Sequence, residues 1–220
     1  MKKKNNKKEK LVMMFHRVNT LMEENLEKWK NIEEIRKAYD EFVNHLKKFR
    51  DLQPDLEIDL SPIEEDWEQK RRVLISKTFP IGNILLVYAY DHGRKADPGL
   101  GMSWDTMKAL KNKKLLKIAG SVNKKVRKYS QNELETYGLT LTMIESLGEA
   151  LRQCDHSNRM RTDMLINRKK TLKKSDYHFK ILRQLLDKRL DKLMTVFSGT
   201  HISFYQNYAE ARSIHKQPSV

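Results

Sequence analysis

Apolar side chains recur every three or four residues along the first quarter of the chain, the spacing that places them on one face of a helix. The first row begins at Leu11 and ends at Trp29, and it predicts a helix from about residue 10 to residue 28. A second row runs from Ile32 to Phe49. Asn31, with an acid three residues later, has the pattern of a helix N-cap, so we expect the second helix to start there.

Start and stop signals divide the middle of the chain into further helices. Ser61-Pro62 predicts a helix that extends to about Tyr90, with a kink or break near Pro80 because proline removes a backbone hydrogen bond. The glycine-rich segment 92–101 is the clearest loop. Shorter helices are expected over 103–112, 113–136 and 140–154, with Ser103 and Thr140 as caps and Gly138 as a stop.

A long helix is predicted from about residue 161 to residue 198, after a polar turn at 155–161. Its apolar residues are spaced by seven, which is typical of helices that pack at a shallow angle; they are Leu165, Leu172, Phe179, Leu186 and Leu193. Gly199 is expected to end it, and a last helix follows.

These patterns predict an all-α fold, an up-and-down bundle of about six to eight helices with a long helix in the C-terminal half. No alternating pattern indicates a strand. We expect one domain over residues 11–214, around a shared apolar interior. The basic segment 1–10 is expected to be disordered, and residues 215–220 to form a second tail.

Composition agrees with helices, since the chain has only 8 glycines and 5 prolines. A single cysteine, Cys154, excludes an intramolecular disulfide and suits a reducing compartment. We expect a small buried residue there and not a reactive thiol. The most apolar segment, Phe79–Tyr90, is too short to cross a bilayer, and no secretory signal is visible. The sequence therefore favours a cytoplasmic protein without a membrane span.

The usual catalytic and cofactor motifs are not found in the sequence. No histidine has a glutamate three residues before it, as a di-iron bundle requires, and no phosphate-binding loop or nucleophile elbow occurs. Glu41 and His45 are spaced as neighbours on one helix face, which is more often a surface pair than a metal site. We therefore expect no enzyme activity, no cofactor, no metal and no small-molecule substrate.

Charge is distributed unevenly along the chain, whose net charge is +15. Residues 11–68 are acidic, whereas residues 107–132 hold nine Lys/Arg and no acid, and residues 159–192 are also basic. Basic faces of this kind bind polyanions such as nucleic acid, but they also simply keep a bundle soluble. The candidate polyanion-binding residues are Lys114, Lys117, Lys124, Lys125, Lys128, Arg168, Lys169 and Lys173.

The last predicted helix carries the pattern FYxxYxxAR in Phe204, Tyr205, Tyr208 and Arg212. Together with Tyr137-Gly138-Leu139-Thr140 and the long lysine-rich helix, it resembles an uncharacterised family of roughly 200-residue helical proteins from Bacteroidetes-type bacteria. The resemblance implies the fold and a bacterial cytoplasm, and no activity. We expect this segment to dock on the bundle, with Arg212 pairing an acid; the alternative is an exposed interface for a partner.

Two functional hypotheses follow. The first is a non-enzymatic helical bundle that acts through protein–protein contacts or self-association, because an apolar helical seam is present and catalytic motifs are not. The second is binding of nucleic acid or another polyanion through the basic faces of residues 107–132 and 159–192.

Overall fold

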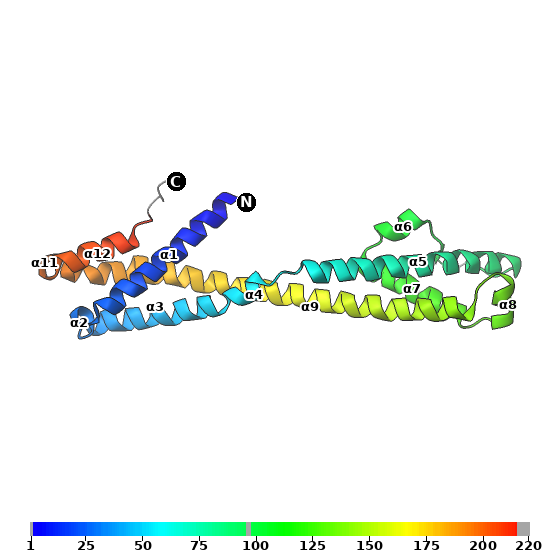
Figure 1. Ribbon diagram of the computed structural model, residues 1–220, viewed down its shortest axis with the longest axis horizontal. Coiled ribbons are helices and arrows are strands. Elements are labelled where there is room, and N and C mark those ends of the chain that lie inside the picture. Colours follow the sequence, from blue (N-terminus) through cyan, green and yellow to red (C-terminus); the bar gives the residue numbers. More distant parts are fainter. Residues whose placement is uncertain (1, 96–97, 215–220) are drawn as a thin grey trace. The chain divides into compact units, whose positions relative to one another are not determined.

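The computed structural model describes residues 2–95 and 98–214, and it confirms the all-α prediction (Figure 1). The chain divides into two compact units instead of one domain. Unit 1 comprises Met1–Ile58 and Arg168–Val220, and unit 2 comprises Asp59–Asn167. Each unit has its own cluster of buried apolar side chains.

The division into two cores has a local cause in the sequence. No buried apolar residue lies between Phe49 and Trp67, and only two serines are buried between Cys154 and Leu182. Both polar stretches join one unit to the other along the chain. Because an apolar interior must be lined by apolar residues, the shared interior expected from the sequence is replaced by two separate ones.

Unit 1 is built from α1, α3 and the second part of α9, with short helices between and after them. Phe15, Phe42 and Leu186 lie at the centre of its core. Helix α12 returns along α1. The elements are α1 (Lys2–Glu24), α2 (Leu26–Trp29), α3 (Glu33–Asp51), α4 (Gln53–Glu57), α9 (Leu141–Leu185), the π turn η1 (Leu186–Leu190), α10 (Asp191–Leu193), the 3-10 turn η2 (Met194–Val196), α11 (Phe197–Thr200) and α12 (Ile202–Arg212).

Helix α1 thus includes residues 2–10, which were expected to form a disordered tail. Residues 215–220, the second expected tail, lie outside the described residues.

Unit 2 is built around α5, which packs against the short strand β1 and against α6 and α7. The first part of α9 completes its core, where Leu85, Val122 and Leu147 are buried. The elements that belong wholly to this unit are α5 (Ser61–Asp91), β1 (Pro98–Gly101), α6 (Trp104–Ala109), α7 (Asn112–Val126) and α8 (Gln131–Thr136).

Proline 80 does not break α5, contrary to the expectation of a possible break near Phe79. Ile75 and Ile81 lie on either side of Pro80 and are both buried in the same core. Packing on both sides therefore outweighs the one backbone hydrogen bond that proline removes.

The local start and stop signals hold at three of the expected positions. The Ser103 hydroxyl accepts a hydrogen bond from the Thr106 N–H at 3.2 Å, and the Thr140 hydroxyl accepts one from the Met143 N–H at 3.3 Å. Gly138 follows α8 with a φ of 81°. Asn31 is not a cap: α3 begins after Ile32, and no side chain caps it.

The turn predicted at 155–161 is wrong, because α9 continues through it. The polar residues there make contacts that a helix supports: Arg159 pairs with Asp155 one turn earlier, and the Ser157 hydroxyl donates to Asp66 at 2.7 Å. Polarity in this stretch reflects solvated helix faces, and not a turn. The helix predicted over 113–136 is instead divided into α7 and α8.

The seven-residue spacing predicted for the long helix fails at both ends. Leu165 and Leu172 are 38% and 47% exposed. After Leu190, Met194 is fully buried, whereas Leu193 is only partly buried. The π turn η1 lies just before this change and adds a residue to the turn, which rotates the following side chains and brings Met194 inward in place of Leu193.

One helical stretch of the described residues, within Glu33–Asp91, is long and apolar enough to cross a membrane by length and composition. In the structure 44% of this apolar stretch is buried, and α5 supplies core residues such as Leu74 and Leu85. This burial is consistent with a core helix of a soluble protein.

Candidate functional site

The C-terminal helix α12 is tied to the chain segment just after α9. Phe204 and Tyr208 are buried in the core of unit 1, and Tyr205 is half-buried. The Tyr208 hydroxyl donates to the Asp191 carboxylate at 2.7 Å, and burial together with that carboxylate raises the pKa of Tyr208. The sequence suggests four residues for docking or an interface, and the three aromatic ones, Phe204, Tyr205 and Tyr208, contact the unit's own core.

The fourth residue, Arg212, is held by two acids. Its Nε and Nη2 atoms donate to the two oxygens of Asp191 at 2.8 and 2.7 Å, and Nη2 also reaches Asp187 at 2.7 Å. A planar guanidinium that holds a carboxylate with two hydrogen bonds is a specific and charge-assisted contact. Arg212 therefore fastens α12, and its side chain is not displayed to a partner.

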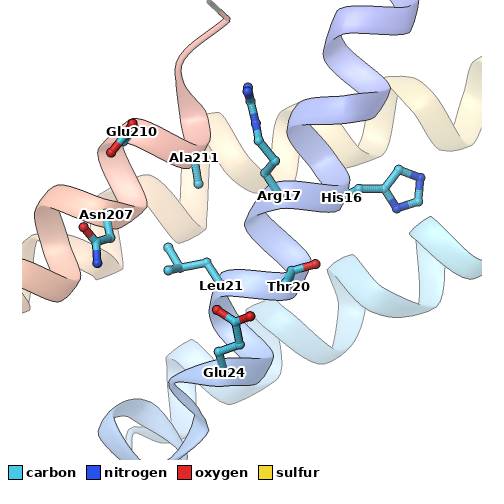
Figure 2. A pocket seen from close by; sticks show the side chains of 8 residues that line it. All are labelled: His16, Arg17, Thr20, Leu21, Glu24, Asn207, Glu210 and Ala211. Carbon is cyan, nitrogen blue, oxygen red and sulfur yellow. The ribbon is translucent and has the colours of Figure 1, made fainter.

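A pocket of about 440 Å³ lies between α1 and α12 in unit 1 (Figure 2). Leu21 and Ala211 face each other across it, and Arg17 extends along its edge and donates to the Ser213 carbonyl. His16 points away from α12. Glu24 and Glu210 add acids to the rim. The lining mixes both charges around a small apolar contact, which favours no single class of ligand.

A larger groove of about 990 Å³ lies in unit 1 between α1, α9 and the chain from α3 to α4. We call it the α1–α9 groove. Its apolar lining consists of side chains from all these helices: Val12, Met13, Phe49, Leu56 and Leu172. Met13 is 55% exposed, and Leu172 is almost as exposed. Clustered apolar side chains that remain open to solvent mark an interaction surface.

Charged residues border the α1–α9 groove. Lys8 lines it from α1 and reaches across to Asp176 at 2.9 Å, with its ammonium over the Phe179 ring. In sequence, residues 2–10 contain six lysines and one acid, and residues 168–174 contain five Lys/Arg and no acid. Two acids also line the groove, Glu9 of α1 and Glu57 of the acidic helix α4. Two walls of the groove therefore belong to strongly basic segments.

The candidate polyanion-binding residues of α9 differ in whether their charged groups are free to bind a phosphate. The Arg168 guanidinium donates to the carbonyls of Leu56 and Ile58, each at 2.9 Å, so it fastens the end of α4 and is not available to a phosphate. Lys169 and Lys173 are exposed. They are not among the residues that line the groove, although they belong to the same basic segment of α9 as Leu172.

Unit 2 carries a second basic feature on α7. Leu115, Val122 and Val126 bury one side of this helix in the core. The lysines follow the opposite side in steps of three, four and seven residues, which places them within one third of the helix circumference. We call this arc the α7 lysine face; its exposed members are Lys113, Lys114, Lys117 and Lys124 of the helix and Lys128 of the turn just after it.

The exposure of these lysines agrees in part with the expectation from the sequence. Lys114, Lys117, Lys124 and Lys128 are exposed as expected, whereas Lys125 is half-buried and has a partner of its own. Lys113 was not singled out from the sequence, although its spacing of four from Lys117 places it on the same side. Among the described residues, no salt bridge joins the exposed members of the face to an acid.

The described residues hold no group of three or more His, Cys, Asp and Glu that could bind a metal ion. Cys154 is buried in unit 2, and burial raises the pKa of its thiol to about 11. A thiol with a raised pKa is a poor nucleophile near neutral pH. The groove and the α7 lysine face are therefore the two candidate sites, and both are suited to binding.

Comparison with protein-family models, with curated proteins and with solved structures finds no match to this chain.

Proposed function

We propose that this protein is a non-enzymatic binding protein, whose α1–α9 groove holds an amphipathic, acidic helix of a partner protein. The observation that carries this proposal is an open apolar groove with basic segments on two of its walls. Helix-in-groove recognition places an apolar helix face on such a floor, and the polar face then meets the charges at the rim.

Three features favour a helix over other occupants. The groove is open, since Met13 is 55% exposed and Leu172 47%, whereas a small molecule is usually enclosed by its site. Its floor is apolar, which a nucleic acid backbone does not use. The excess of lysine in residues 2–10 and in residues 168–174 favours acids on the partner, and the acidic α4 favours a basic residue at the end of the partner helix that lies nearest to it.

The test uses fluorescence anisotropy with three labelled helical peptides that share one apolar face and differ in the polar face: acidic, neutral or basic. We expect the acidic peptide to bind most tightly. Leu172→Glu and Met13→Glu should each weaken it by tenfold or more. Val87→Glu is the matched control, because Val87 is an apolar residue of unit 2 that is 52% exposed.

Equal affinity for the acidic and basic peptides would contradict the charge argument. Equal binding by the wild type and Leu172→Glu would exclude the groove.

A second candidate function is polyanion binding by the α7 lysine face, and the exposed lysines opposite a fully buried side favour it. Contact with phosphates releases counterions, so such binding is independent of sequence and falls steeply with salt. The face has few aromatic residues for stacking on bases, which favours the phosphate backbone as the ligand.

The test is an anisotropy titration with a labelled DNA duplex at several salt concentrations. Replacing Lys113, Lys117, Lys124 and Lys128 with glutamine should reduce the affinity and make the slope of log K against log[salt] shallower by about 3 to 4, since four phosphate contacts are lost. Replacing four exposed lysines of unit 1, Lys28, Lys30, Lys37 and Lys47, is the control. A slope that does not change in the α7 variant excludes this function.

We also propose that the protein works in a bacterial cytoplasm and without catalysis. The single cysteine, Cys154, is buried and allows no intramolecular disulfide, which supports a reducing compartment such as the cytoplasm.

A further inference from the structure

Two histidines from distant parts of the chain meet on the surface of unit 1. His45 lies on α3 and His178 on α9, and their Nδ1 atoms are 2.9 Å apart. Both side chains are half-buried, with ring centroids 5.0 Å apart. An imidazole nitrogen without a proton is the most common metal ligand in proteins, and two of them converge here.

The two nitrogens are close enough for one metal ion to bind both. Two nitrogens that bind one metal ion at about 2.05 Å, at right angles to each other, lie about 2.9 Å apart; at the tetrahedral angle they lie about 3.3 Å apart. The observed distance of 2.9 Å is that of a hydrogen bond between the two rings, and it shows that the two nitrogens already lie within the span of one metal ion. Right-angled positions occur in the tetragonal geometry that Cu²⁺ and Ni²⁺ prefer.

We propose that His45 and His178 form a two-histidine site for a divalent transition-metal ion, bound through both Nδ1 atoms with water in the remaining positions. The ligand set stops at two, because no larger cluster of metal-binding side chains exists among the described residues. Cu²⁺ suits such a sparse set best, because it has the highest affinity for imidazole among the divalent first-row ions.

The proton balance of this site is simple. In the metal-free pair one Nδ1 donates its proton to the other, so one ring carries its proton on Nδ1 and the other on Nε2. Binding requires both rings to carry the proton on Nε2 and to turn so that the two Nδ1 lone pairs meet. The Nδ1 proton moves to Nε2 of the same ring through solvent, and no proton is released.

The surroundings keep both rings uncharged near neutral pH, the form that binds metal. Burial is the main cause that lowers the pKa of each histidine; Lys48 lowers both further, and His45 adds to the effect on His178. Glu41, one turn before His45, acts in the opposite sense on His45, and its carboxylate is held by Arg189 at 2.8 Å. From α9 the Tyr177 ring faces both imidazoles.

The experiment titrates the full, untagged chain with CuCl₂ and with NiCl₂ at pH 7.5 in isothermal calorimetry. We expect one strong Cu²⁺ site per chain, and a loss of affinity of tenfold or more in His45→Gln and in His178→Gln. His16→Gln is the control, because His16 is a histidine of the same unit outside the pair. The circular dichroism spectrum and the unfolding midpoint show whether each variant is folded.

A second measurement does not depend on variants. Electron paramagnetic resonance of the protein with one equivalent of Cu²⁺ should show hyperfine splitting from two equatorial nitrogens. The proposal is overturned if the wild type and both variants bind Cu²⁺ equally, or if the spectrum shows no pair of equatorial nitrogens. In either case the 2.9 Å contact is a structural hydrogen bond only.

Discussion

Arg212 holds Asp191 through both of its carboxylate oxygens, at 2.8 and 2.7 Å, and so fastens the last helix of the chain to the segment that follows the π turn. The Arg212 side chain is only 18% exposed and that of Asp191 30%, so the pair is partly shielded from water. Tyr208 adds a third hydrogen bond to the same carboxylate. Phe204 of the same helix is buried in the core, but an apolar contact has no preferred direction. The hydrogen bonds to Asp191 therefore define the orientation of α12.

We predict that Asp191→Asn destabilises unit 1 by about 2 kcal/mol, because it leaves the Arg212 charge partly buried with a weaker partner. Asp187→Asn should cost about 0.5 kcal/mol, since that carboxylate is 54% exposed and surface pairs contribute little. Urea unfolding followed by circular dichroism measures both. Equal costs for the two variants would show that the twofold contact to Asp191 has no special role.

Gly101 is predicted to resist substitution. Its φ is 70°, which costs an L-residue about 1–2 kcal/mol, and a Cβ there would lie 2.4 Å from Leu86 Cδ2. Gly101→Ala should therefore lower the free energy of unfolding by at least that amount. Gly148→Ala is the matched control: it lies within α9, and the atom nearest its Cβ would be the flexible end of Arg127 at 2.9 Å, with Asn123 in ordinary contact at 3.6 Å. Thermal unfolding should show Gly148→Ala to be neutral or stabilising.

Stability should fall on acidification below about pH 6.5. The pKa values of His45 and His178 are lowered in the folded protein, mainly by burial and then by neighbouring positive charge, from an ordinary value of 6.5. The unfolded chain therefore binds more protons in that range, and the stabilisation present above pH 6.5 is lost as the pH drops.

The double variant His45→Gln/His178→Gln should reduce this pH dependence without abolishing it, because burial also lowers the pKa of His16. Urea unfolding between pH 5 and 7.5 measures the slope. An identical slope in the double variant and the wild type would be inconsistent with the lowered pKa values of the pair.

Unit 2 is predicted to fold alone, since residues 59–167 are continuous in sequence and enclose their own core. The isolated segment should show helical circular dichroism and one cooperative thermal transition. Leu147→Ala, at a fully buried position, should lower its stability by about 2–5 kcal/mol. A segment that is helical but melts without a transition would mean that its core needs unit 1.

Local sequence signals predicted local structure well. The spacing of Leu11, Phe15 and Val18 places all three in the core, and Ser103 and Thr140 cap the helices that follow them. In each of these cases the residues that decide the structure are within a few positions of one another. The prediction of a turn at 155–161 was wrong, because polar residues occur on the solvent-exposed face of a helix as often as in a turn.

Features that depend on distant pairings were not predictable. The two cores are separated by a stretch between Cys154 and Leu182 that has no buried apolar residue. In the sequence, Leu165 and Leu172 continue the seven-residue spacing through this stretch, and only the structure shows that they are exposed. His45 and His178 are 133 positions apart, and nothing in the sequence relates them. The α1–α9 groove combines four segments, so its apolar floor appears only in the folded unit.

The most direct test of the proposed function is photo-crosslinking. An acidic amphipathic peptide with a benzophenone on its apolar face is irradiated with the full chain, and the crosslinked residues are identified by mass spectrometry. We expect crosslinks to Met13, Leu56 and Leu172, and we expect Leu172→Glu to suppress them. Crosslinks confined to α7 or to the pocket between α1 and α12, or the same yield with a basic peptide, would contradict the assignment of the groove.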